Sequence, residues 1–334
     1  MINRANYLLV KEFLVYRNEV VQNSPETVHT YWEGLRHMLS WADETYLSKA
    51  PNIRPTLPEY ITNNREDGRA GELSIKYQSK VLNQCREFLK WASMNVPSMS
   101  GIKPAFIATL IVRRSKLGGR LEKREYYTLD EIRTISLLEP QNLRQQRDIA
   151  AVCFMFLSGI RIGAFVSLPC KAINLARRRV EQSPQIGVNT KNSKAAVTFL
   201  LPIDDLMEPI RVWDKIVRPI SGDNGYWFAP VMFNGRTVEY SFGKWQEVLG
   251  NEKDRENIFR KGLHDICESA GIAYKSPHKI RHGFGVYGVK NAKDMGQMKA
   301  ISQNMMHANM GITDGLDGKL AEDDLDDIMG TFGK

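Results

Sequence analysis

Residues 276–282 read Ser276-Pro277-His278-Lys279-Ile280-Arg281-His282, a basic segment with a proline at the point where helical spacing begins. Residues three apart lie on one face of a helix, so His278 and Arg281 are expected to address one anion together. His278 and His282 also have the spacing of a zinc pair. The residues between them include two cations and no carboxylate, an arrangement that would repel a divalent ion, so we predict no metal here.

A second arginine follows the long apolar run that ends in Ser158-Gly159-Ile160-Arg161-Ile162-Gly163-Ala164. Arginine suits a phosphodiester because its planar fork donates two parallel hydrogen bonds and stays charged. When no metal takes part, attack on phosphate needs such cations, since negative charge grows on the nonbridging oxygens. Two later segments add further candidates, the polar turn Thr190-Lys191-Asn192-Ser193-Lys194 and the sequence Met305-Met306-His307.

In this order, Gly-x-Arg, a turn lysine, His-x-x-Arg-His and a late histidine, the chain resembles the tyrosine recombinase (phage integrase) family. The resemblance implies a mainly α fold with a small antiparallel β-sheet (α+β), made of an N-terminal helical core-binding domain and a C-terminal catalytic domain. It also implies that no cofactor is used. The chain departs from the family pattern at Ala164, where an acidic residue is common, and at Met306, where glycine is common. The roles implied are phosphate clamping by Arg161 and Arg281, protonation of the leaving 5′-hydroxyl by Lys191, with Lys194 as the alternative, and hydrogen bonding or proton transfer by His278 and His307.

The nucleophile position of the family is the most informative departure. Relatives with this local pattern carry Thr-Asp-x-x-Tyr-Gly, whereas this chain reads Thr313-Asp314-Gly315-Leu316-Asp317-Gly318, and no tyrosine follows Tyr287. A carboxylate is a poorer nucleophile towards a phosphodiester, and its charge repels the phosphate that the arginines attract. We therefore predict a chain that binds DNA without covalent cleavage. The otherwise intact set favours an engineered inactive variant of a site-specific recombinase. The alternative is a naturally inactive accessory or regulatory DNA-binding protein on the same scaffold.

Composition agrees with a nucleic-acid partner. The 334 residues carry a net charge of +8 with a pI near 9.2, despite the acidic run Glu322-Asp323-Asp324-Leu325-Asp326-Asp327. Four cysteines without CxxC spacing predict buried thiols in a reducing compartment. The longest apolar run, Ile149–Ile160, is too short to cross a bilayer. We expect a cytoplasmic, nucleoid-associated or mobile-element protein. A metal-dependent nuclease or helical RNA-binding protein is disfavoured, because paired carboxylate clusters do not accompany the basic motifs.

Periodicity and turn signals divide the chain into four parts. Residues 1–111 are predicted to form a helical domain, with helices at 7–15, 27–42, 58–63 and 74–94. The resemblance implies that this is the family's SAM-like core-binding domain. Residues 125–318 are predicted as the catalytic domain, with helices at 142–159, 241–249, 257–270, 278–290 and 298–306. Within that domain, strands at 186–189 and 196–203 are expected to form a hairpin. Residues 319–334 are predicted as an acidic amphipathic tail.

Residues 112–124 are predicted as a basic linker that lies along DNA phosphates, with an exposed charged loop as the alternative. The candidate DNA-binding residues are Arg113, Arg114, Lys116, Arg120, Lys123 and Arg124, together with Lys194.

The resemblance implies double-stranded DNA as the partner, bound by a clamp of two domains that acts as a homotetramer on two sites. In the tail, Leu325, Ile328, Met329 and Phe332 form one apolar stripe at helical spacing. We predict that this stripe docks on a neighbouring subunit. A helix folded onto its own domain is the alternative.

Overall fold

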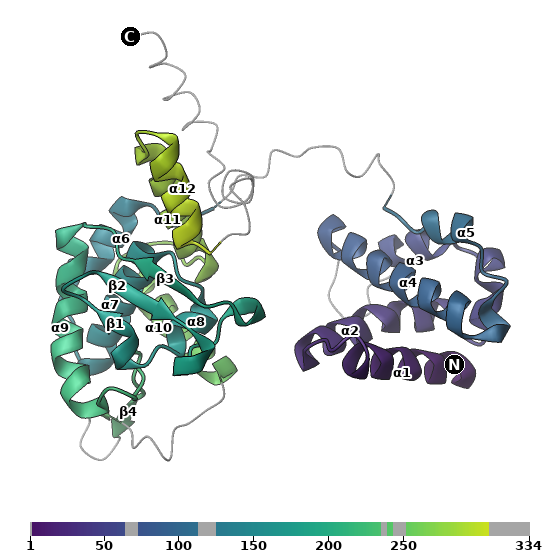
Figure 1. Ribbon diagram of the computed structural model, residues 1–334, viewed down its shortest axis with the longest axis horizontal. Coiled ribbons are helices and arrows are strands. Elements are labelled where there is room, and N and C mark those ends of the chain that lie inside the picture. Colours follow the sequence, from purple (N-terminus) through teal and green to yellow (C-terminus); the bar gives the residue numbers. More distant parts are fainter. Residues whose placement is uncertain (1, 64–72, 113–124, 235–238, 243–251, 307–334) are drawn as a thin grey trace, which may run out of the picture. The chain divides into compact units, whose positions relative to one another are not determined.

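The computed structural model describes residues 2–63, 73–112, 125–234, 239–242 and 252–306. The chain divides into two compact units, Met1–Glu122 and Lys123–Lys334, which are considered separately below (Figure 1). The expected mainly α fold with a small antiparallel sheet is confirmed. No helix within the described ranges is long and apolar enough to cross a membrane.

The first unit is a bundle of helices around an aromatic core. Its α-helices are α1 (Arg4–Glu19), α2 (Pro25–Ala42), α3 (Leu57–Asn63), α4 (Ile75–Asn95) and α5 (Pro104–Ala108). The Ser24 side chain caps α2, as its position before Pro25 predicts. Phe13, Phe88 and Trp91 meet at the centre with ring centroids 5.4 to 6.2 Å apart. Trp41 is also buried, whereas Tyr31, Trp32 and Tyr77 pack at the edge of the core.

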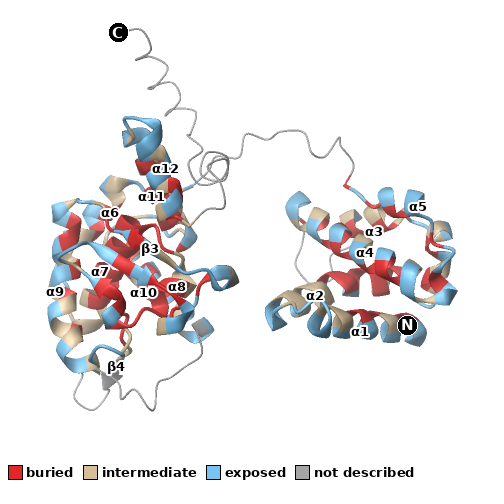
Figure 2. Ribbon diagram, viewed as in Figure 1, coloured by how far each residue is buried: buried red, intermediate tan, exposed pale blue. Residues whose placement is uncertain are grey.

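The second unit is built around α7 (Leu143–Ser158), which is buried from Arg147 to its end and packs against four other helices (Figure 2). A helix that is apolar on all sides needs neighbours all round. These neighbours are α6 (Leu129–Ser136), α9 (Asp204–Ser221), α10 (Glu252–Ser269) and α11 (His278–Asn291). The short helix α8 (Ile162–Val166) packs on α10, and α12 (Met295–Asn304) packs on α11 and beside the sheet (Figure 1).

A three-stranded antiparallel sheet covers part of this helical core. Its order is β1 (Ile173–Asn174), β2 (Arg179–Gln182) and β3 (Ala196–Phe199), and β2 pairs with β3 from Arg179 opposite Phe199 to Gln182 opposite Ala196. A separate hairpin joins β4 (Val231–Asn234) to β5 (Glu239–Phe242).

Three local expectations were wrong or incomplete. Residues 186–189 form no strand. The strand that pairs with β3 is β2 instead. Residues 186–189 belong to the long connection between these two strands, which contains two 3-10 turns, Pro184–Ile186 and Lys191–Ser193. Residues 241–242 belong to β5 rather than to a helix, and 243–249 lie outside the described residues. Helix α9 was not predicted.

Candidate active site

Arg281 lies where three helices meet. Its side chain is 2% exposed, Nη1 donates to the Gly159 carbonyl at 2.5 Å, and Nη2 donates to the Met305 carbonyl at 2.6 Å. Gly159 ends α7 and Met305 ends α12, so the guanidinium of α11 joins the C-terminal ends of both helices. Carbonyl groups at a helix end lack intrahelical partners, and a cation is well placed to satisfy them. We call this junction the arginine corner, defined by Gly159, Arg161, Arg281 and Met305.

Gly159 lets α7 stop at this corner and brings Arg161 to it. Its φ of +62° is left-handed, and a Cβ at this position would lie 2.6 Å from the ring of Phe284. No other residue type fits both requirements without strain. The chain then turns outward, and Arg161 becomes the half-buried residue that precedes α8, with its carbonyl accepting from the Phe165 amide at 2.9 Å.

Asn304 fastens the other side of the corner, and no sequence pattern pointed to it. Its Oδ1 accepts from the Phe199 amide at 2.6 Å, while its Nδ2 donates to the carbonyls of Phe199 and Ser158, each at 3.0 Å. One side chain therefore ties α12 to β3 and to the end of α7. An asparagine at a helix end is indistinguishable from an ordinary cap or turn residue in sequence, so only the fold reveals this role.

The residue after the corner, Met306, adopts a left-handed backbone with φ of +52°. Side chains disfavour this region and glycine does not. The conformation gives a physical reason for the glycine of the family pattern at this position. His307 and Asp317 follow and lie outside the described residues.

Lys191 and Lys194 lie in the connection between β2 and β3, and both are exposed. This connection is tied to α8, because the Asn189 amide donates to Ser167 Oγ at 2.8 Å and Ser167 ends that helix. The same helix begins at Arg161. The fold thus attaches the lysine turn and the first arginine to one short element.

His278 and Arg281 do not point the same way, although both lie on α11. His278 is exposed at the first helical position, with its ring 4.6 Å from that of His282 in an edge-on arrangement, whereas Arg281 is buried. Three residues correspond to about 300° of helical rotation, which leaves the two side chains on adjoining rather than identical faces. The sequence expectation that both address one anion is a prediction that the geometry leaves open.

Tyr127 positions the start of α11. Its hydroxyl donates to the Lys275 carbonyl at 2.8 Å and accepts from the Lys275 amide at 2.7 Å, and its own amide donates to the Lys279 carbonyl at 3.1 Å. Lys275 Nζ in turn pairs with Glu131, the acidic member of the capping box that Thr128 forms on α6. Burial raises the pKa of the Tyr127 hydroxyl, so it remains a neutral donor.

The remaining predicted residues cannot be placed. All the linker cations, Arg113, Arg114, Lys116, Arg120, Lys123 and Arg124, lie outside the described residues, as does the tail 319–334. Within the part of the chain that is described, no group of three or more His, Cys, Asp or Glu side chains could hold a metal ion. The expected free, buried state of Cys85, Cys153, Cys170 and Cys267 is confirmed.

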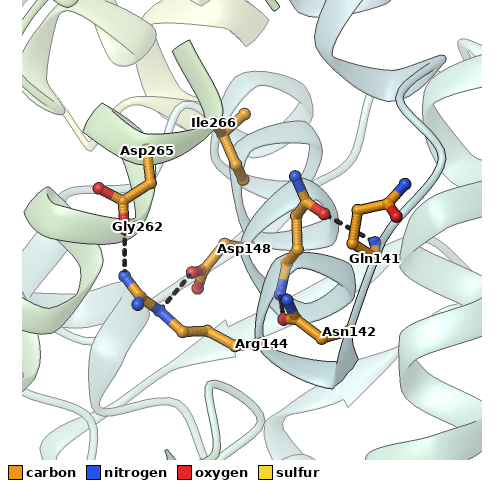
Figure 3. Close-up of a pocket in the computed structure, with 8 residues that line it drawn as sticks. Gln141, Asn142, Arg144, Asp148, Gly262, Asp265 and Ile266 are labelled. Atoms are coloured by element: carbon orange, nitrogen blue, oxygen red, sulfur yellow. Dashed lines mark hydrogen bonds and ion pairs between the residues drawn. The ribbon is translucent and has the colours of Figure 1, made fainter. Parts of the chain in front are cut away.

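A separate hollow of about 260 Å³ lies at the other end of α7, between that helix and α10 (Figure 3). Figure 3 shows Arg144 between two carboxylates, 3.6 Å from Asp148 and 2.6 Å from Asp265. Asp148 also pairs with the buried Arg147 at 2.6 Å. Burial raises the pKa of Asp148, and the two arginines oppose this effect. These charges neutralise one another, and the ion pair between Arg144 and Asp265 links α7 to α10. The hollow is separate from the arginine corner.

The chain is similar to known proteins over most of its length. No protein-family model matches the chain. The tyrosine recombinase XerC of Yersinia pestis is 24% identical over 317 residues, covering 91% of this chain and 88% of that protein. The tyrosine recombinase XerC of Histophilus somni is 23% identical over 310 residues, covering 92% of this chain and 91% of that protein. Over most of its length the chain is therefore similar to proteins of the tyrosine recombinase family.

Two solved structures share the fold of this chain. A lambda integrase dimer bound to a COC′ core site aligns with a TM-score of 0.59 and 12% identity, covering 95% of each chain. The Tn1549 transposon integrase in complex with circular intermediate DNA also aligns with a TM-score of 0.59, at 14% identity, covering 97% of this chain and 98% of that one. These identities are low, so the shared fold is the conclusion drawn from them.

Proposed function

We propose that this tyrosine recombinase binds duplex DNA, seats one phosphodiester at the arginine corner, and holds it without cleaving it covalently. The observation that carries the proposal is the bond from Arg281 to the Gly159 carbonyl. It joins two arginine-bearing segments that are far apart in sequence, because Arg161 follows Gly159 by two residues. The DNA-bound relatives of the same fold support duplex DNA as the partner.

Electrostatics explains what such a corner would contribute. Arg281 remains charged at any physiological pH, and its burial lowers the local dielectric through which its charge acts. The carbonyls of Gly159 and Met305 fix its orientation before DNA arrives, so little reorganisation accompanies binding. Arg161, half-buried at the start of α8, supplies the second positive charge.

The outer groups would serve the reaction of the family. In that reaction a tyrosine oxygen forms a bond to phosphorus while the bond to the 5′-oxygen breaks, and the departing oxygen receives a proton. Lys191, exposed on a turn tied to α8, is the proposed proton donor, with Lys194 as the alternative. His278 and His307 are the proposed hydrogen-bonding and proton-transfer groups.

Asp317 would interrupt this reaction at the first step. An aspartate carboxylate is a weaker nucleophile towards a phosphodiester, and an acyl phosphate formed by it would hydrolyse readily. Its side chain is also shorter than that of tyrosine. Such a chain fits either an engineered inactive recombinase or a natural accessory or regulatory protein, and both would act where the DNA of the cell or mobile element lies.

Duplex binding by an Arg161→Gln variant tests the proposed corner. Arg161 is only half-buried, so its replacement should leave the fold intact while removing one phosphate contact. We expect weaker binding at every duplex sequence and a salt slope shallower by about one. The matched control is Arg211→Gln, which removes an exposed arginine that pairs with Asp204 and Glu208 on α9. Equal loss in both variants, or no binding by the unaltered chain, would contradict the proposal.

A further inference from the structure

Three consecutive arginines form the turn between β1 and β2. Arg177, Arg178 and Arg179 are all exposed, at the tip and the outgoing strand of this hairpin. The turn is tightly bonded, because the Arg177 amide donates to Asn174 Oδ1 at 3.0 Å and the Arg178 amide donates to the Leu175 carbonyl at 3.1 Å. These two hydrogen bonds fix the turn and leave three long cationic side chains at its surface. We call residues 177–179 the arginine turn.

The charges of the arginine turn are not neutralised by the rest of the described chain. None of its three side chains makes an ion pair or hydrogen bond with the residues that the structure describes. Other exposed arginines of the same unit behave differently. Arg133 pairs with Asp205 and Arg260 with Glu256. The three positive charges repel one another, and no described acidic residue offsets this repulsion. This arrangement favours binding of an anion from outside the chain.

The arginine turn is joined to the arginine corner through β3. The Leu200 amide donates to the Arg178 carbonyl at 2.9 Å, and Arg179 pairs with Phe199 across the sheet. Phe199 is in turn bonded to Asn304, which also bonds Ser158 at the end of α7. The turn lies at the opposite end of β3 from the lysine turn, about 10 Å away along the strand. Measured along the duplex axis, one DNA strand carries about three phosphates over that length.

We propose that the arginine turn is a second phosphate-binding site, which grips the backbone of the same duplex that is seated at the arginine corner. This inference rests on the proposed function and adds a contact outside its site residues. Arginine forks match phosphate oxygens in geometry as well as charge, and three on successive residues can follow a backbone that runs past the corner. The acidic run of the tail, 322–327, is the competing occupant, and the experiment below separates it from DNA.

The test compares two variants that lose the same charge. In the first, Arg177, Arg178 and Arg179 are all replaced by Gln. In the second, the paired surface residues Arg133, Arg211 and Arg260 are replaced by Gln, which also removes three positive charges from the same unit. Exposed pairs of this kind contribute little stability, so both variants should fold, and circular dichroism verifies this. Binding to a short duplex of arbitrary sequence is measured over a range of salt concentrations.

The arginine-turn variant should bind at least about tenfold more weakly at moderate salt, with a salt slope shallower by about two to three. The paired-arginine variant should change the salt slope by much less. It loses the same net charge but no direct phosphate contact, and charges far from the DNA are screened by salt. Equal slopes in the two variants would overturn the inference while leaving the proposed function intact. Absence of duplex binding by the unaltered chain would instead overturn the proposed function.

A third arm addresses the tail. If the arginine turn binds the acidic run 322–327, replacing the three arginines by Gln should leave duplex binding by the full chain unchanged or strengthen it. That result would also overturn the inference. Glu181, the exposed acid two residues beyond the turn on β2, offers a change of opposite sign. Glu181→Gln should strengthen duplex binding by about two- to threefold if phosphates lie against this face. Unchanged affinity would count against DNA at this position.

Discussion

Arg281 is a buried cation whose guanidinium is held by the carbonyls of Gly159 and Met305. The His-x-x-Arg spacing singles out this arginine in the sequence, but it does not predict these two contacts. Sequence indicated a phosphate ligand, whereas the structure shows that the same side chain also joins α7, α11 and α12. Binding a phosphate and joining helix ends both require a planar group with several hydrogen-bond donors. The sequence alone therefore cannot tell which of the two roles an arginine has.

Replacing Arg281 by Lys tests the joining role. A single ammonium cannot reproduce two bonds at 2.5 and 2.6 Å from separate nitrogens, so one carbonyl should lose its partner. We expect the free energy of unfolding of the second unit to fall by about 2 to 3 kcal/mol, measured by urea denaturation. Arg177→Lys, on the exposed turn, is the control and should change it by less than about 0.5 kcal/mol. A fully stable Arg281→Lys variant would show that the two carbonyl bonds contribute little.

At the scale of single residues, the predictable candidates were those with a distinctive chemical pattern. Arg281 bonds the carbonyl of Gly159, two residues before Arg161, and Lys191 lies on a turn tied to α8, which Arg161 precedes. Asn304 escaped prediction because its three bonds reach β3 and α7, which are distant in sequence. Such a role depends on tertiary contacts and leaves no local signal.

Secondary-structure elements were predictable where periodicity and capping agreed. Thr128 and Glu131 form a capping box at the start of α6, and Asn142 caps α7 at the point where the predicted helix 142–159 begins. Helix α9 was missed because Pro209 and Pro219 lie within it, and proline usually ends a helix. Its buried residues Leu206, Ile210, Trp213 and Val217 follow helical spacing, and their burial outweighs the lost backbone bonds.

Helix α4 supplies a pH test of the first unit. Burial raises the pKa of Cys85 from 9.0 to about 12, with its backbone hydrogen bond opposing this effect. Between these values the unfolded thiol loses its proton while the folded thiol keeps it, so stability falls as pH rises. The contribution of Cys85 should fall by about 1.4 kcal/mol per pH unit above pH 9.

Urea denaturation at several alkaline pH values checks this, with Cys85→Ala as the comparison. The alanine variant should be less stable near neutral pH because of the space left behind, yet its stability should decline less steeply above pH 9. Parallel declines in the two proteins would mean that Cys85 does not titrate in this range.

At the scale of the whole molecule, the mainly α fold class with a small antiparallel sheet was accessible from the sequence. The family resemblance carried most of that expectation. The placement of the tail was not accessible, because an apolar stripe on an acidic helix can dock on its own unit or on a neighbour with the same chemistry.

Truncation after Gly318 separates these two possibilities for the tail. If the stripe docks on a neighbouring subunit, the truncated chain should form fewer multimers on DNA in sedimentation experiments, with single-site binding unchanged. The full-length variant Ile328→Asp with Phe332→Asp should behave in the same way, because a charge disrupts the apolar face. Unchanged multimers with a lowered melting temperature would instead show that the tail packs on its own unit.

The central claim is that the chain holds a DNA phosphodiester while Asp317 prevents covalent cleavage. The most direct measurement incubates the unaltered chain and an Asp317→Tyr variant with nicked duplexes from a randomised pool, and looks for a protein–DNA adduct that survives denaturing electrophoresis. We predict an adduct from the tyrosine variant only. No adduct from either protein would favour the accessory or regulatory alternative. An adduct from the unaltered Asp317 chain would contradict the account.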